Sequence, residues 1–159
     1  MQLNIGTRQY RTKPKQFASI NNDVIGNIVD LSLEEIIDRV GNKGYTFTRA
    51  IMRGARTKEN FIKQRFLVLD FDEGMSEEKF KRRCTELRLS YVFMYRTLSW
   101  SKTEERFRAV FLMENWIENS QVAYIINDML YRIFPESDKS CRDITKLFLG
   151  GKKVVDINL

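Results

Sequence analysis

Two aspartates at the end of an apolar segment are the residues of this sequence best suited to chemistry. The apolar residues 66–69 have the length and composition of a buried strand, and Asp70 and Asp72 follow them. Side chains two residues apart in a strand leave it on the same face. Two neighbouring carboxylates repel one another without a cation, and their oxygens suit Mg²⁺ or Mn²⁺. The pair therefore predicts a metal site for in-line phosphoryl transfer, although strand-end aspartates also act as solubilising or loop-capping groups.

The absence of histidine excludes several reaction classes. The sequence contains none, so Ser/His/Asp hydrolysis, histidine-bound zinc and the histidine-metal nicking sites of rolling-circle initiators are ruled out. Cys84 and Cys141 are far apart and lack the spacing of a metal site or a disulfide framework. No stretch resembles a signal peptide or a membrane span. We therefore expect a cytoplasmic protein in a reducing setting, with no membrane partner.

The charge of the chain is compatible with a polyanionic partner. Lys and Arg number 27 against 21 Asp and Glu, which gives a net charge of +6. The basic residues gather in patches at residues 8–15, 49–65, 79–83 and 102–108. Such patches favour nucleic-acid binding, but lysines that merely solvate helix faces give the same composition. Charge alone does not decide between the two.

Hydrophobic periodicity predicts interleaved strands and helices. Strands are expected at residues 45–50, 66–69, 91–95 and 107–113, and a hairpin is expected from residues 147–149 and 154–157 around Gly150 and Gly151. Helices are expected after the N-cap candidates Ser32 and Ser76 and after Ser120, the first ending at Gly41. Two apolar faces are expected to lie in the core: Phe80, Cys84 and Leu87 of the second helix, and Val122, Ile125, Ile126, Met129, Leu130 and Ile133 of the third.

The length of the chain fits one domain. Its 159 residues, 43% of them hydrophobic, can close one core. There is no repeat, low-complexity stretch or Pro/Gly/Ser linker, so residues 1–159 are expected to form a single domain. The last residues, 154–159, are strand-like and carry no polar tail. We therefore expect the domain to be the N-terminal part of a longer protein.

The order of these features resembles the archaeo-eukaryotic primase superfamily, and within it the primase-polymerase domains of plasmid, phage and mobile-island replication proteins. The resemblance covers about residues 45–153. It implies an α/β (α+β) fold in which helices pack on a central, largely antiparallel mixed sheet of the RRM-like palm type. Asp70 and Asp72 match the first motif of that family, hydrophobic-Asp-x-Asp. Asp138 matches the carboxylate of the third motif, with Asp143 as a possible substitute.

The second motif departs from the family pattern. The family has Ser-His before a strand rich in Arg and Phe, whereas here Ser99 is followed by Trp100. An indole can stack on a base, but it cannot donate from a cationic ring to a triphosphate. Lys102, Arg106 and Arg108 could bind the phosphates instead. Alternatively, the two arginines only share a solvated strand face.

The third motif also departs in one position, since Lys146 stands where the family often has Arg. Asp138 and Asp143 could equally be loop-capping residues. In the resemblance, Asp70, Asp72 and Asp138 are the catalytic and metal-binding residues, and Ser99, Trp100, Lys102, Arg106, Arg108 and Lys146 contact nucleotide or DNA.

The resemblance implies a DNA-dependent primase or polymerase that replicates a mobile element by two-metal nucleotidyl transfer. Its cofactor would be Mg²⁺ or Mn²⁺. Its partners would be single-stranded or primer-template DNA, nucleoside triphosphates and a helicase domain or subunit. Two alternatives stay open: a catalytically inactive DNA-binding module of a replication initiator, and a metal-dependent nuclease, which needs only carboxylates and a water.

Overall fold

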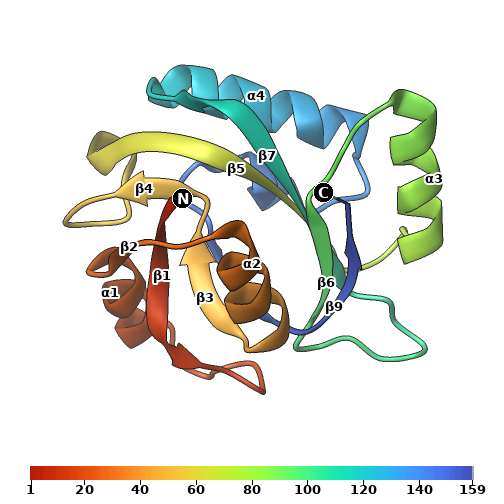
Figure 1. Cartoon of the computed structure of the whole chain (residues 1–159), viewed down its shortest axis with the longest axis horizontal. Helices are drawn as coiled ribbons and strands as arrows, with labels where there is room; N and C mark the ends of the chain where they lie inside the picture. The colour runs from red at the N-terminus through yellow and green to blue at the C-terminus, as the bar shows by residue number, and fades with distance from the viewer. Residues whose placement is uncertain (159) are drawn as a thin grey trace.

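The computed structural model describes residues 1–158, in which nine strands form two antiparallel sheets (Figure 1). The four-stranded sheet has the order β2-β1-β3-β8, and its strands are β1 (Gln2–Gln9), β2 (Ile28–Asp30), β3 (Tyr45–Thr48) and β8 (Leu147–Phe148). The five-stranded sheet has the order β4-β5-β7-β6-β9, and its strands are β4 (Ala50–Met52), β5 (Phe61–Phe71), β6 (Phe93–Thr97), β7 (Phe107–Ile117) and β9 (Gly151–Ile157). The predicted α/β class with antiparallel pairing is thus confirmed, with the strands divided between two sheets instead of one central sheet.

Helices cover both sheets (Figure 1). The helical segments are α1 (Ala18–Ile25), α2 (Leu33–Ile36), the π-helical η1 (Ile37–Asn42), the short 3₁₀ turns η2 (Lys58–Asn60) and η3 (Lys139–Arg142), α3 (Glu77–Leu87) and α4 (Ser120–Ile133). Ser32 and Glu35 form a capping box at the start of α2, and the Ser76 hydroxyl accepts a hydrogen bond from the Lys79 amide at the start of α3. These two helix starts follow from local sequence, as predicted. Among residues 1–158, no helix is both long and apolar enough to cross a bilayer.

The chain passes from the four-stranded to the five-stranded sheet at two points, and it returns to the four-stranded sheet between β7 and β8. Between β3 and β4, the only intervening residue is Arg49, which is buried. Between β8 and β9, the crossing is made at Leu149 and Gly150. The predicted hairpin over residues 147–157 is therefore wrong, because β8 pairs with β3 and β9 pairs with β6.

Strand β5 lies inside the five-stranded sheet and carries the candidate chemistry. It pairs with β4 on one side and β7 on the other, and its residues 66–71 are all buried. Phe71 stacks on Phe107 of β7 with ring centroids 4.8 Å apart. Phe80 of α3 packs against both rings, and Phe134 after α4 packs against Phe71. This packing fixes the end of β5. Asp70 is the next-to-last residue of the strand and is buried, whereas Asp72 directly follows the strand and is exposed.

Two predicted core faces are partly exposed. In α3, Phe80 and Cys84 are buried as predicted, but Leu87 is 49% exposed. In α4, the buried residues are Ala123, Asn127 and Leu130. The outer residues of the predicted stripe, Val122, Ile125, Met129 and Ile133, are 40–58% exposed. The prediction that this whole stripe lies in the core is therefore wrong.

Candidate active site

A cavity of about 220 Å³ lies at the end of β5 and gathers charged side chains from five parts of the chain. Three carboxylates line it: Asp70, Asp72 and Asp138. The other lining residues are Lys13, Thr97, Leu98, Ser99, Arg106, Arg108, Lys146 and Leu149. Residues that are up to 136 positions apart in sequence thus meet at one small opening.

The backbone brings Asp138 to Asp70. The Asp138 amide donates to the Asp70 carbonyl oxygen at 2.8 Å, so the loop after α4 is tied to the end of β5. The Asp138 carboxylate accepts from the Ser140 amide at 2.8 Å and thereby begins η3. Asp138 therefore caps a turn, as the alternative interpretation expected, and lines the cavity as well.

Asp70 is paired with a buried arginine. In the register of the sheet Asp70 lies opposite Arg108, and Arg108 Nη2 donates to Asp70 Oδ2 at 2.9 Å, with the two side chains 12% and 6% exposed. Arg108 Nη1 also donates to the Leu149 carbonyl, as does the Tyr95 hydroxyl. Burial lowers the pKa of Arg108, but the charges and hydrogen bonds of Asp70 and Tyr95 together outweigh burial and raise the pKa above its usual value. The Arg108 guanidinium is therefore occupied within the protein.

Lys146 lies between two of the three carboxylates. Its ammonium is 3.4 Å from Asp70 Oδ2 and 3.1 Å from Asp138 Oδ2, and its side chain is 13% exposed. For Asp138, burial raises the pKa of the carboxyl, but hydrogen bonds from Ser140 and the charge of Lys146 lower it by more. The net shift of the pKa is therefore downward. The ammonium thus fills the place where a bridging cation would neutralise both carboxylates.

A phenylalanine ring supports the cations of this site. Phe148 of β8 lies 5.2 Å from the Lys146 ammonium, 5.8 Å from the Arg108 guanidinium and 5.5 Å from the Arg49 guanidinium. Such cation–π contacts stabilise charges that are removed from water. Arg49 donates hydrogen bonds to backbone carbonyls, among them those of Cys141 and Val68, and burial lowers its pKa to about 10.

Comparison with known proteins gives a similarity of fold. No protein-family model matches the chain, and no curated protein matches it. Among solved structures, it is similar to the AEP domain of Cyanophage S-2L Primase-Polymerase (PrimPol), with a TM-score of 0.49 and 8% identity. The similarity covers 78% of this chain and 63% of that one, which is less than two thirds of its length. At this identity the likeness concerns the arrangement of the backbone and not the activity.

Not all the predicted site residues line the cavity. Ser99, Arg106, Arg108 and Lys146 line it together with the carboxylates. Trp100 does not, and its ring lies 4.0 Å from the guanidinium of Arg96. Lys102 lines a neighbouring cavity of about 520 Å³, which also contains Asp72 and Arg106. Asp143 uses Oδ1 to accept from the amide and hydroxyl of Thr145, at 2.8 Å each, and lines a third cavity.

Lys13 is the site residue that sequence reasoning missed. It comes from the loop between β1 and α1, which is held near the site by the hydrogen bond from the Tyr10 amide to the Gly44 carbonyl. The only sequence signal was the basic patch at residues 8–15. That patch carries no indication of its position, because β1 joins the fold through pairing with β2 and β3.

The chemistry of the carboxylates fits a divalent cation in part. Asp70 Oδ1 is buried and has no hydrogen-bond partner among the described residues, so one oxygen is left for a ligand. Asp72 is exposed beside it. Within residues 1–158, however, no three acidic, Cys or His side chains are grouped closely enough to hold a metal ion. The donors thus fit one ion at Asp70 and Asp72, while Lys146 competes for the place between Asp70 and Asp138.

Proposed function

We propose that this domain catalyses nucleotidyl transfer on a DNA template, as a primase or polymerase domain in the replication of a mobile element. The observation that carries the proposal is the convergence of Asp70, Asp72 and Asp138 with the basic residues Lys13, Arg106, Arg108 and Lys146 at one cavity. The motif order described above supports the same assignment.

Asp70 and Asp72 would hold Mg²⁺ or Mn²⁺. The ion, when bound, supplies charge neutralisation at the triphosphate and activates the attacking 3′ hydroxyl. Arg108 orients the Asp70 carboxylate through its hydrogen bond at 2.9 Å. Lys13 and Arg106 line the cavity and would attract the triphosphate, since charge-assisted hydrogen bonds to phosphate are strong.

Nucleotide incorporation on primed and unprimed DNA templates with Mn²⁺ tests the proposal. We expect weak, Mn²⁺-dependent extension, because Trp100 cannot supply the cationic donor of the family histidine. Arg106→Ala should raise the KM for nucleotide about 10-fold or more, since a hydrogen bond to a charged group contributes roughly 1.5–3 kcal/mol. Arg8→Ala, an exposed arginine of β1 that does not line the cavity, is the control.

Absence of incorporation under all these conditions would reject the proposed activity. Shortening of the labelled DNA would indicate the nuclease instead. An unchanged KM in Arg106→Ala would show that other basic residues bind the triphosphate.

A DNA-binding module without catalysis is the second candidate, and the position of Lys146 favours it. An ammonium between Asp70 and Asp138 neutralises the carboxylates without a metal. Retained DNA binding together with unmeasurable Mn²⁺ binding would support this candidate over the enzyme.

Binding of single-stranded DNA should weaken steeply with salt in either case, because bound lysines and arginines displace condensed counterions. Replacing Lys102 and Arg106 by Ala should flatten the slope of log K against log salt by about 1.4, at roughly 0.7 per phosphate contact. Arg108 is left intact because its guanidinium is bound to Asp70. The measurement is fluorescence anisotropy at several salt concentrations. A slope equal to that of the wild type would place the DNA elsewhere.

A further inference from the structure

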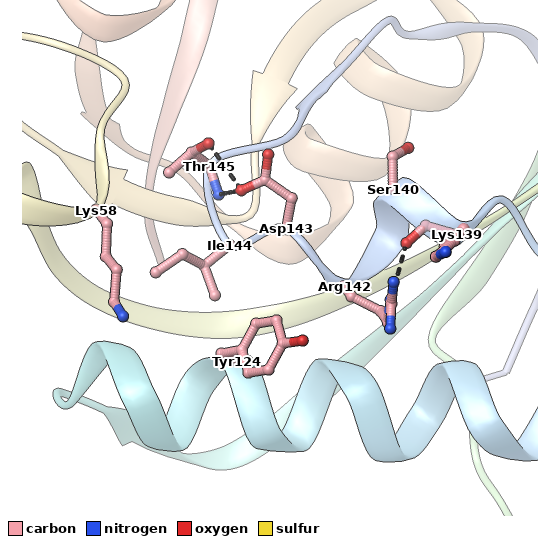
Figure 2. A pocket seen from close by; sticks show the side chains of 8 residues that line it. All are labelled: Lys58, Tyr124, Lys139, Ser140, Arg142, Asp143, Ile144 and Thr145. Atoms are coloured by element: carbon pink, nitrogen blue, oxygen red, sulfur yellow. Dashed lines mark hydrogen bonds between the residues drawn. The ribbon is translucent and has the colours of Figure 1, made fainter.

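The cavity lined by Asp143, of about 570 Å³, lies between α4 and the segment of residues 139–145 (Figure 2). Figure 2 shows Tyr124 projecting from α4 toward Ile144, with Lys58 reaching in from the connection between β4 and β5. Its volume falls within the usual range of ligand sites, roughly 300–1,000 Å³. None of Asp70, Asp72 and Asp138, and no other residue of the acidic cavity at the end of β5, lines it.

Two arginines bind the backbone of the segment that forms one wall of this cavity. Arg49 donates to the carbonyls of Cys141 and Asp143, and Arg56 Nη1 donates to the Thr145 carbonyl at 2.7 Å. The Asp143 carboxylate accepts from Thr145 at 2.8 Å. Because these bonds fix the backbone of the wall, the cavity does not need to be formed by a ligand.

The charge of the cavity suits an anion. Lys58, Lys139 and Arg142 line it, against one carboxylate, Asp143, which is engaged by Thr145. Lys58 donates to the Gln121 amide oxygen at 3.4 Å. Within the part of the chain that the structure describes, neither lysine forms an ion pair. Two uncompensated ammonium groups favour phosphate oxygens.

The cavity also offers apolar surface. Tyr124 is 39% exposed although it lies on a helix that packs against the sheet. An accessible ring between lysines is the combination with which proteins bind single strands, because each base has a face to stack and each nucleotide a phosphate. A free inorganic anion would leave the ring unused.

The turn η3 joins this cavity to the acidic one. Asp138, immediately before η3, lines the acidic cavity, and Lys139, its first residue, lines the basic one. Cys141, in the same turn, is buried. A strand that crosses η3 would therefore contact both cavities.

We infer that the cavity between α4 and residues 139–145 binds single-stranded DNA next to the acidic site, with bases on Tyr124 and phosphates on Lys58 and Lys139. The inference rests on the proposed function, because that function makes the bound strand the template. It adds a binding site that is separate from the carboxylates.

The test uses the full chain and a fluorescently labelled oligothymidylate of about twelve nucleotides, within the usual range of single-strand sites. Lys58→Ala with Lys139→Ala should weaken binding about 10-fold and flatten the salt slope by about 1.4. Lys152→Ala with Lys153→Ala removes the same charge from exposed residues of β9 and should have a much smaller effect. Equal losses in the two double variants would overturn the inference.

A photo-crosslink locates the strand. An oligonucleotide with 5-iodouracil should crosslink to Tyr124, and Tyr124→Leu should abolish that crosslinked peptide while the protein stays folded by circular dichroism. Crosslinks confined to other peptides, or loss of the Tyr124 crosslink on addition of an equal concentration of free dTTP, would overturn the inference, the latter in favour of a mononucleotide pocket.

The two proposals fail separately. Crosslinking at Tyr124 without any nucleotide incorporation supports this site and rejects the polymerase activity. Incorporation that is unchanged in Lys58→Ala with Lys139→Ala, together with unchanged DNA affinity, rejects this site and leaves the activity in place.

Discussion

Asp70→Asn should destabilise the domain by about 3 kcal/mol, whereas Asp72→Asn should change its stability by no more than about 0.5 kcal/mol. The two residues are close in sequence but differ in environment. Asp70 is 4% exposed and is the carboxylate partner of Arg108, so its neutralisation leaves a buried cation without a counter-charge. Asp72 is exposed and forms no ion pair with the residues that the structure describes. Urea unfolding of both variants measures the difference.

The same pair separates stability from activity. If both carboxylates hold the metal ion, Asp72→Asn should lower incorporation about 100-fold or more without unfolding the protein, because metal charge contributes several kcal/mol in such reactions. Asp72→Asn is therefore the cleaner test of the metal site. Equal stability of the two variants would contradict the role of Asp70 as the partner of Arg108. Full activity in Asp72→Asn would remove Asp72 from the site.

Local signals in the sequence predicted the elements that support the site. The continuous apolar run before Asp70 gave β5, and Ser32 and Ser76 marked helix starts through hydrogen bonds within a few residues. Gly41, however, does not end the first helix, which continues as η1 to Asn42. A Cβ at position 41 would lie 2.3 Å from Val154 Cγ2, so the glycine allows β9 to pack closely there.

Periodicity could not show which sheet a strand joins. Gly150 and Gly151 between two β-prone segments are a hairpin signal. In the fold they allow close approach instead, since a Cβ on Gly151 would lie 2.4 Å from Tyr95 Cδ2. The division of β8 and β9 between two sheets depends on such distant contacts. Contacts between residues that are far apart in the chain cannot be predicted from the periodicity of a single sequence.

Periodicity also could not show which face of α4 is covered. The apolar residues of the helix span more than the width of its contact with the sheet, and Asn127 lies in the centre of that contact. Its side chain is paired with Gln64 of β5 at 2.9 Å. A buried polar pair of this kind is invisible when only apolar positions are counted, so the stripe was assigned to the core as a whole.

The grouping of the acidic site was predictable in part. Motif order alone suggested that Asp138 belongs with Asp70 and Asp72, and the three residues do line one cavity. The position of Lys146 was not predictable, because it depends on η3 and on the ring of Phe148. The positive charge of Lys146, however, directly affects whether Asp70 and Asp138 can bind a metal ion.

Lys146→Met should bind Mn²⁺ about 10-fold or more tightly than the wild type. The ammonium lies 3.4 Å and 3.1 Å from Asp70 and Asp138 and repels any divalent ion that approaches them. At such distances two unit charges interact by about 4 kcal/mol for an effective dielectric constant near 20. Solvent screening reduces this repulsion, and the part that remains lowers the affinity for Mn²⁺. Calorimetric titration of Mn²⁺ measures the change.

Stability provides a second measurement for the same variant. Without metal, Asp70 and Asp138 lose a shared cation, so Lys146→Met should unfold at a lower temperature than the wild type. Mn²⁺ at about 100 times its Kd should return about 2.7 kcal/mol. The control is Lys43→Met, which frees the exposed carboxylate of Asp38 from its 2.6 Å ion pair. Within residues 1–158, Lys43 pairs with no second carboxylate, so its loss does not leave two carboxylates for a metal ion. If Lys146→Met binds Mn²⁺ no better than the wild type and Lys43→Met, the ammonium does not compete with a metal ion, and no ion binds between Asp70 and Asp138.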